Sequence, residues 1–390
     1  NMRSWGEDPE TVSKLISAYL DGFRTIGILS CAKHFPGHGD SSVDSHIALP
    51  VLNHTFKRLS GIELVPFKSA ISSGVDSIMS AHLYLPDIDR QNVTTFSEQI
   101  LNILLRKRMG FQGLVVTDAL VMESVSKQFK SGQEAAMAFA AGADLLLMPR
   151  NADDAINAIT KALMIGEIPI SRLEDALNRR YMALSKVASN TVEDKTINIF
   201  KVDSSKSEKL VRDMVLDSTY IYNPSILRKI SLGINLISLD GIFQSKFMNS
   251  SSPSITVPEE FGYQTILNHP LGPSIWTGNS KEPLNIDILG KASIFLQIFT
   301  RGNPFSTKFN DIDLWKNALT QLLRLNRLNG VVVYGSHYFW LELSKELDAC
   351  IPAAFSPGQI IASQKYVLSS LFDKTSIKCS TDSKAVEFTD

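Results

Sequence analysis

Residues 31–50 hold a dense group of side chains that can do chemistry. The stretch reads CAKHFPGHGDSSVDSHIALP and contains three histidines, two aspartates and one lysine. Ionisable side chains are costly to bury unless they are paired or used, so this crowding indicates a site and not a core element. Asp44 and His46 are separated by one serine, which allows the carboxylate to orient the imidazole and to stabilise its protonated form.

Asp118, in the stretch GLVVTDALVM, is a second candidate. It directly follows an apolar strand, and a carboxylate at such a strand end can serve as a nucleophile or a base. An aspartate here can equally cap the amino terminus of a helix. The polar residues that end the other predicted strands favour a functional role; they are Lys33 with His34, Ser80 with His82, and Arg150.

These two groups of residues together predict glycoside hydrolysis. A carboxylate nucleophile that faces a proton-carrying group is the requirement of the retaining mechanism. His46 is the expected proton carrier, because the ordinary imidazole pKa of about 6.5 suits acid and base roles near neutral pH. Lys33 and His34 can donate hydrogen bonds to sugar hydroxyls, and Arg3 can do so from the preceding loop.

A metal site is the alternative interpretation of the same loop, because imidazole and carboxylate are common metal ligands. The candidate ligands lie in a glycine-containing loop and not on one face of a helix, as they do in an HExxH site; they are His34, His38, Asp40, Asp44 and His46. We therefore predict no metal and no cofactor. For His38, a hydrogen bond to the loop backbone explains the residue as well as a direct catalytic role does.

Alternating helices and strands are expected to position these side chains. Between residues 1 and 189, amphipathic helices separate short apolar strands, the pattern of a parallel sheet with helical cover. Strands are predicted just before the histidine-containing loop and over 75–85, 113–120 and 143–149. Their polar ends then share the face on which β/α barrels carry out catalysis. An eight-stranded barrel needs roughly 200 residues or more, so we expect residues 1–189 to be the carboxyl-terminal half of a TIM-type barrel.

A second domain follows a polar segment. Residues 190–205 form a predicted linker, and residues 206–390 again alternate helices and strands, as in an open α/β sandwich with helices on both faces. The serine- and proline-rich segment 249–262 is expected to be an exposed loop.

Composition excludes several classes of protein. The 39 basic and 40 acidic residues are well mixed along the 390-residue chain, so no footprint for nucleic acid is visible. The cysteines, Cys31, Cys350 and Cys379, are widely spaced and predict free thiols. No apolar run approaches the length of a membrane span. The location stays open between the cytoplasm and export as a secreted protein or lipoprotein, because a signal would lie upstream of Asn1.

Several motifs resemble one known family. KHFPGHG from Lys33, DSH from Asp44 and LP at 49–50 resemble the signature of the β-N-acetylglucosaminidase branch of glycoside hydrolase family 3. RSWGEDP from Arg3, TDAL around Asp118 and LLMP at 146–149 are similar to further segments of that family and occur in its order.

The resemblance implies that Asp118 is the nucleophile and that His46 with Asp44 is the acid/base dyad. It implies that Arg3, Lys33 and His34 contact the substrate, a saccharide with a terminal GlcNAc, typically from bacterial peptidoglycan. A neutral imidazole does not repel an anion, so a phosphorylase on the same scaffold is one alternative. A non-catalytic sugar-binding remnant is another, because the family's first strands have no counterpart here.

Overall fold

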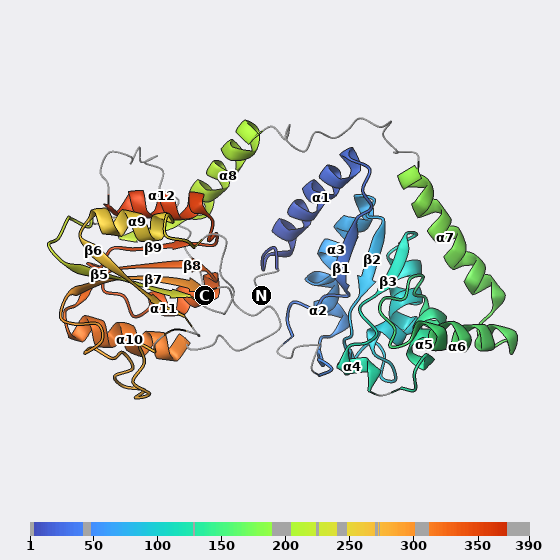
Figure 1. The fold of residues 1–390 in the computed structure, drawn as a ribbon. Coiled ribbons are helices and arrows are strands. Elements are labelled where there is room, and N and C mark those ends of the chain that lie inside the picture. Colours follow the sequence, from blue (N-terminus) through green and yellow to red (C-terminus); the bar gives the residue numbers. More distant parts are fainter. Residues whose placement is uncertain are drawn as a thin grey trace. The chain divides into compact units, whose positions relative to one another are not determined.

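The chain folds into two compact units, seen in a computed structural model (Figure 1). The structure describes residues 4–41, 48–127, 129–188, 204–223, 226–239, 248–269, 272, 274–300 and 312–372. The first unit contains the described residues up to 188, and the second contains those from 204 onward. Most of the predicted linker lies outside the described residues, so the boundaries 1–189, 190–205 and 206–390 stay a prediction.

The first unit is built from short strands, each followed by helices. Asp8 begins its first helix by accepting a hydrogen bond from the Thr11 N–H, with Pro9 in the first turn. In chain order the elements are α1 (Pro9–Thr25), β1 (Cys31–Phe35), α2 (Phe56–Gly61), α3 (Leu64–Ser72), β2 (Ser77–Ser80), the 3₁₀ helix η1 (Thr94–Phe96), the π-helix η2 (Gln99–Arg108), β3 (Leu114–Thr117), α4 (Glu123–Ser126), α5 (Gln133–Ala141), α6 (Ala152–Met164) and α7 (Ile170–Ala188).

The strands of the first unit form a parallel sheet in the order β1-β2-β3. Cys31 lies opposite Ser77, and Ser77 lies opposite Leu114, so the three strands begin at the same level. Helices and sheet enclose a large core, in which Ile78 and Val115 have no exposed surface, and two smaller apolar clusters. Parallel strands alternating with helices are the arrangement of a sector of a β/α barrel, as the sequence predicts.

The segment 143–149 runs beside β3 without forming a regular strand. Leu145 makes a single bridge with Val116. Beyond it, the Leu147 N–H donates to the Thr117 hydroxyl at 2.9 Å in place of a backbone carbonyl, and Met148 has a φ of 46°. The prediction of a regular strand over 143–149 is therefore wrong. The Thr117 hydroxyl, as acceptor, and the left-handed backbone of Met148 interrupt the ladder of backbone hydrogen bonds.

The buried carboxylate of Asp144 joins helices η2 and α7 to strand β3. Its oxygens lie 2.6 Å from Arg106 Nη2, 3.1 Å from Arg172 Nη2 and 3.1 Å from Arg179 Nη1. The N–H of Val115 also donates to it, at 2.9 Å. Burial lowers the pKa of Arg106 to about 10, although Asp144 opposes that change. All the same, Arg106 is protonated at neutral pH, and Asp144 is the anion that balances this crowded group of cations.

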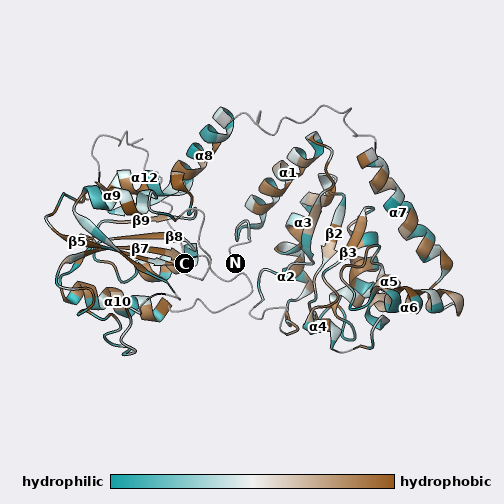
Figure 2. Cartoon of the chain, viewed as in Figure 1, coloured by the Kyte–Doolittle hydropathy of each residue, from teal (hydrophilic) through white to brown (hydrophobic). Residues whose placement is uncertain are grey.

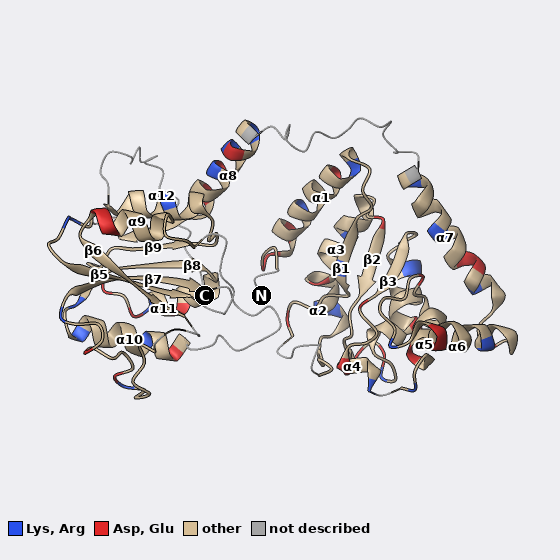
Figure 3. Cartoon of the chain, in the orientation of Figure 1, with Lys and Arg blue, Asp and Glu red and all other residues tan. Residues whose placement is uncertain are grey.

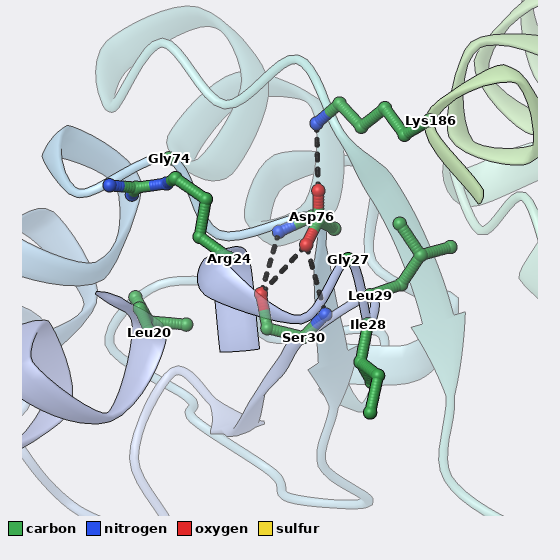
Figure 4. Close-up of a pocket in the computed structure, with 9 residues that line it drawn as sticks. All are labelled: Leu20, Arg24, Gly27, Ile28, Leu29, Ser30, Gly74, Asp76 and Lys186. Atoms are coloured by element: carbon green, nitrogen blue, oxygen red, sulfur yellow. Dashed lines mark hydrogen bonds and ion pairs between the residues drawn. The ribbon is translucent and has the colours of Figure 1, made fainter. Parts of the chain in front are cut away.

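A cavity of about 370 Å³ lies at the amino-terminal ends of β1 and β2, away from the predicted catalytic face (Figure 4). Asp76, on its wall, accepts hydrogen bonds from Lys186 Nζ at 2.7 Å and from the Ser30 N–H and hydroxyl at 2.9 Å. Burial by itself raises the pKa of Asp76, but these hydrogen bonds outweigh it and hold the pKa below its ordinary value. The cluster therefore fastens α7 to the start of the sheet.

The second unit contains a larger sheet and the remaining helices. Its elements in chain order are α8 (Ser204–Ser218), β4 (Tyr220–Asn223), β5 (Gly233–Leu239), α9 (Pro253–Glu260), β6 (Tyr263–Asn268), β7 (Ser293–Thr300), α10 (Ile312–Arg324), β8 (Leu328–Gly335), α11 (His337–Ser344), β9 (Ala353–Ser356) and α12 (Ile361–Phe372).

This six-stranded sheet has the order β4-β9-β8-β7-β5-β6, and only β4 runs antiparallel to its neighbour. Its strands carry no Lys, Arg, Asp or Glu (Figure 3), and β7 and β8 are strongly apolar (Figure 2). Such strands are buried on both faces. Helices α10 and α11 cover one face and α9 and α12 the other, which confirms the predicted open α/β sandwich.

The expected exposed loop at 249–262 is wrong, because this segment contains helix α9. Pro253 stands in the first turn, where a missing N–H costs nothing. Ser254 is fully buried, and its carbonyl accepts hydrogen bonds from the side-chain amides of Asn235 at 2.8 Å and Gln297 at 2.7 Å. The serines and prolines of this segment are typical of a loop in the sequence. In the fold, side-chain amides from β5 and β7 donate hydrogen bonds to its buried backbone.

Two smaller sequence predictions also have outcomes. Cys31 and Cys350 are free, as expected, and both are exposed; Cys379 lies outside the described residues. Among the helices in the described part of the chain, none combines the length and the apolar character needed to cross a membrane.

Replacing Asp144 with asparagine is expected to lower the free energy of unfolding by roughly 3–5 kcal/mol, because it leaves buried arginines without their anion. Urea unfolding at pH 7 measures this change. Asp175→Asn is the matched control: it removes an exposed carboxylate 3.9 Å from Arg179 and should cost less than about 1 kcal/mol. Equal losses in the two variants would contradict the role given to Asp144.

Asp76 predicts a pH-dependent contribution to stability. Because its folded-state pKa is lowered, the contribution is present above the unfolded-chain pKa of about 3.9 and is lost as the pH falls through the folded-state value. Asp76→Asn should therefore lower the free energy of unfolding at pH 7 by about 1–3 kcal/mol, and the difference from the wild type should shrink below pH ~4. Lys186→Met removes a partner that is 59% exposed and should have a smaller effect. An Asp76→Asn difference that does not change with pH would show that the carboxylate charge contributes nothing.

Candidate active site

The candidate site lies where strands β1, β2 and β3 end. Phe35 pairs with Ser80, and Ser80 pairs with Thr117, so the strands finish at one edge of the sheet. The N–H of Asp118 donates to the Ser80 carbonyl at 3.2 Å and extends this ladder by one residue. The parallel alignment therefore brings His34, from the end of β1, next to Asp118, from the end of β3, as the sequence predicts.

The two carboxylate oxygens of Asp118 have different surroundings. Oδ1 accepts a hydrogen bond from the Ala119 N–H at 2.9 Å. Oδ2 lies 3.7 Å from Nε2 of His34, and the side chains of Asp118 and His34 are 21% and 18% exposed. Asp118 does not cap a helix, because the next helix begins at Glu123 with Met122 as its cap residue. One oxygen is thus held by the backbone, while the other faces a partly open site.

His34 reaches Asp118 through an irregularity in β1. Lys33 lies opposite Met79 and Phe35 lies opposite Ser80, so His34 is an extra residue in the pairing. Such bulges redirect a side chain at the end of a strand. Lys33 is exposed, and the peptide bonds Lys33–His34 and Phe35–Pro36 are both cis.

Three of the predicted site residues lie outside the described residues: Arg3, Asp44 and His46. Their positions relative to Asp118 stay a prediction. The loop that leads toward Asp44 is described as far as Ser41, whose hydroxyl lies 2.8 Å from Nδ1 of His38. The His38 ring therefore has a hydrogen-bond partner within its own loop, as its interpretation as a loop residue requires. That partner is the Ser41 side chain and not the backbone.

An ion-pair network that the sequence analysis missed supports this loop. Arg58 Nη2 lies 2.9 Å from Glu63 Oε1 and 3.4 Å from Asp40 Oδ2, and Nε2 of His54 lies 3.2 Å from Asp40 Oδ2. Ligand atoms of Asp40, His54 and Glu63 lie within 4.8 Å of one another, a spacing that a metal ion could use. Arg58 already brings a positive charge between the two carboxylates, so an ion-pair network fits these residues better than a metal does.

Glu63 also fixes the path of the loop backbone. A Cβ at position 37 would lie 2.6 Å from Cβ of Glu63, and Gly37 has a φ of +133°. Only glycine meets both conditions. No local motif announces this contact, since Gly37 and Glu63 meet only in the folded unit.

His82 is completely buried beneath the site. Its Nδ1 lies 2.7 Å from the Thr95 hydroxyl and its Nε2 lies 3.1 Å from the Ala119 carbonyl. Both ring nitrogens of His82 therefore have partners, and the residue is internally satisfied just beyond the end of β2. No local motif predicts that one of its partners is Ala119, the residue that follows Asp118.

The surroundings of Asp118 suit a carboxylate that acts as a nucleophile or stabilises a positive charge. Asp118 is partly accessible, one of its oxygens is held by a backbone N–H, and an imidazole stands beside the other oxygen. A carboxylate positioned in this way can attack an electrophilic carbon or stabilise a developing positive charge.

Comparison with known proteins gives a consistent result for both units. The glycosyl hydrolase family 3 N-terminal domain matches residues 1–182, and the bacterial glycosyl hydrolase family 3 C-terminal domain matches residues 226–373. Beta-hexosaminidase A of Pseudoalteromonas piscicida is 40% identical over 161 residues, which are 38% of this chain and 27% of that protein. The beta-hexosaminidase of Tolumonas auensis is 36% identical over 190 residues, 48% of this chain and 56% of that protein.

A solved structure has a similar fold over 95% of this chain. The family 3 beta-N-acetylglucosaminidase from Paenibacillus sp. str. FPU-7 superposes with a TM-score of 0.76 at 24% identity, and the match covers 95% of this chain and 70% of that chain. The chain spans 27% and 56% of the lengths of the two curated relatives. The two matched domains together account for most of the sequence, and the chain belongs to glycoside hydrolase family 3.

Proposed function

We propose that this chain carries the nucleophile of a retaining exo-β-N-acetylglucosaminidase that acts on terminal GlcNAc, for example in peptidoglycan-derived saccharides. The observation that supports this most directly is the Asp118 carboxylate, which is partly exposed at the end of β3 with Oδ2 beside His34. Relatives named beta-hexosaminidase support the substrate class.

In the proposed first step, Asp118 attacks the anomeric carbon and forms an ester with the sugar. The bond from that carbon to the leaving oxygen breaks, and His46, oriented by Asp44, gives its proton to that oxygen. The hydrogen bond from the Ala119 N–H occupies Oδ1, so Oδ2 is the attacking oxygen. In the second step the neutral His46 takes a proton from water, and the resulting hydroxide displaces Asp118 from the sugar.

The remaining predicted residues are assigned to substrate binding. His34 stands beside the attacking oxygen, where its imidazole can contact a sugar bound at Asp118. Lys33 is exposed at the end of the same strand and is proposed to donate hydrogen bonds to sugar hydroxyls, as is Arg3. Charged donors of this kind both orient the sugar and discriminate between hydroxyl configurations.

Asp118→Ala is expected to lower the turnover of a chromogenic GlcNAc β-glycoside by about 10³-fold or more, because it removes the carboxylate that is proposed to form the ester. In the wild type, an acid quench at early times should yield a peptide containing Asp118 that carries one N-acetylhexosaminyl group. Asp153→Asn, which changes an exposed aspartate at the start of α6, is the matched control and should keep wild-type turnover.

The products of the same assay separate the proposal from its alternatives. Release of free GlcNAc in phosphate buffer supports the hydrolase, whereas release of a sugar 1-phosphate would identify a phosphorylase. Absence of turnover together with calorimetric binding of GlcNAc would replace the enzyme with a sugar-binding protein. Full turnover in Asp118→Ala would remove Asp118 from the mechanism.

Lys33→Met is expected to raise KM about 10-fold or more, since a charged hydrogen bond to the sugar is worth about 1.5–3 kcal/mol. The free energy of unfolding should change little, because Lys33 is exposed. Steady-state kinetics on the same glycoside measure the effect, with Lys127→Met, at an exposed residue directly after helix α4, as the control. An unchanged KM would exclude Lys33 from substrate binding.

A further inference from the structure

His82, which has no part in the proposed chemistry, contacts the backbone of the residue that follows Asp118. His82 follows strand β2 and has no exposed surface. Its ring lies between the Thr95 hydroxyl, 2.7 Å from Nδ1, and the Ala119 carbonyl, 3.1 Å from Nε2. A buried imidazole is costly unless both nitrogens are satisfied, and here both have partners.

The partners determine which ring nitrogen must carry a proton. The Ala119 carbonyl can only accept a hydrogen bond, so Nε2 of His82 is the donor in that contact. The Thr95 hydroxyl has one proton: it either donates that proton to the Ala81 carbonyl at 3.1 Å and accepts from Nδ1, or donates it to Nδ1 instead. A proton on Nε2 is therefore required whether the ring is neutral or charged, and Thr95 can satisfy Nδ1 in both cases.

The contact with Ala119 acts on the backbone that carries the nucleophile. The Ala119 N–H holds Oδ1 of Asp118, and the Asp118 N–H donates to the Ser80 carbonyl. The peptide group that follows Ala119 is fixed at both of its ends. Its carbonyl accepts from His82, and its N–H, from Leu120, donates to the Leu147 carbonyl at 2.9 Å.

We propose that His82, braced by Thr95, is a positioning residue for Asp118: its Nε2–H fixes the Ala119 carbonyl and so sets the direction of the carboxylate. This inference rests on the proposed role of Asp118 as the nucleophile. A displacement of about 1 Å at a reacting group can lower a rate about 100-fold, so loss of this hydrogen bond should affect the chemical step more than substrate binding.

Two substitutions of similar size separate the two halves of the contact. In His82→Gln the side-chain amide occupies the place of Nε2 and can still donate to Ala119. In His82→Asn the shorter amide occupies the place of Nδ1, so it can reach Thr95 but leaves the Ala119 carbonyl without its donor. Both variants replace the buried imidazole with one buried amide. Any loss of stability or activity that comes only from replacing a buried histidine should therefore appear in both variants.

The expected result is a split between the two variants in kcat. With the chromogenic GlcNAc β-glycoside, His82→Asn should lower kcat about 100-fold and His82→Gln less than about 10-fold, with KM within about twofold of the wild type in both. Glu123→Gln, on an exposed residue of α4, should behave as the wild type. Equal losses of kcat in both variants, or kcat kept in His82→Asn, would overturn the inference.

Hydrogen exchange gives a readout that does not depend on turnover. Release of the Ala119 carbonyl should make the Ala119 N–H exchange about 10-fold faster or more in His82→Asn than in His82→Gln, while amides in α3 stay unchanged. If the wild-type chain shows no glycosidase activity, the proposed function fails, and this measurement still decides the positioning role. Equal exchange at Ala119 in the two variants would refute it.

Thr95 supplies a second pair of variants if substitutions at His82 prevent folding. Thr95→Ser keeps the hydroxyl that faces Nδ1, and Thr95→Val removes it at nearly constant volume. Thr95→Val should speed exchange at Ala119 and lower kcat with little change in KM, and Thr95→Ser should restore most of both. An Ala119 amide that exchanges at the same rate in both Thr95 variants would show that Thr95 does not brace His82.

Discussion

The candidate site depends on the parallel alignment of β1, β2 and β3. Because the strands begin at one level, they also end at one edge, where the Asp118 N–H donates to the Ser80 carbonyl. A shift of one residue in this pairing would turn the side chains to the opposite face of the sheet and separate Asp118 from His34. The chemistry of this unit is thus a consequence of strand register, since the two residues are far apart in the chain.

The carboxylates at the two ends of this sheet differ in whether their oxygens are already bound by other protein groups. At the amino ends and along β3, the carboxylates of Asp76 and Asp144 are occupied by lysine, arginine and backbone donors. At the carboxyl ends, Oδ2 of Asp118 has a more distant neighbour and stays partly open. Residues at the first end hold the helices in place, and residues at the second are available to a substrate, the division that β/α barrels show in general.

The sequence predicted those parts of the structure that depend on local pattern. Amphipathic periodicity predicted helix α1, and apolar runs predicted strands β2 and β3, whereas β1 (Cys31–Phe35) begins inside the histidine-containing stretch that the expected short strand was to precede. Residue type at a strand end was enough to select His34 and Asp118. Features that need a distant partner could not be predicted: Gly37 against Glu63, His82 against Ala119, and the serine-rich helix α9, whose buried Ser254 depends on amides from β5 and β7.

Each of the two units has its own buried apolar core, and this separation matters for the evolution of the chain. Among the described residues, each cluster of buried apolar side chains draws its members from one unit alone. Recombination of genes at the segment between the units would leave each core intact. The described apolar core of the six-stranded unit is therefore complete without any side chain from the unit that carries Asp118.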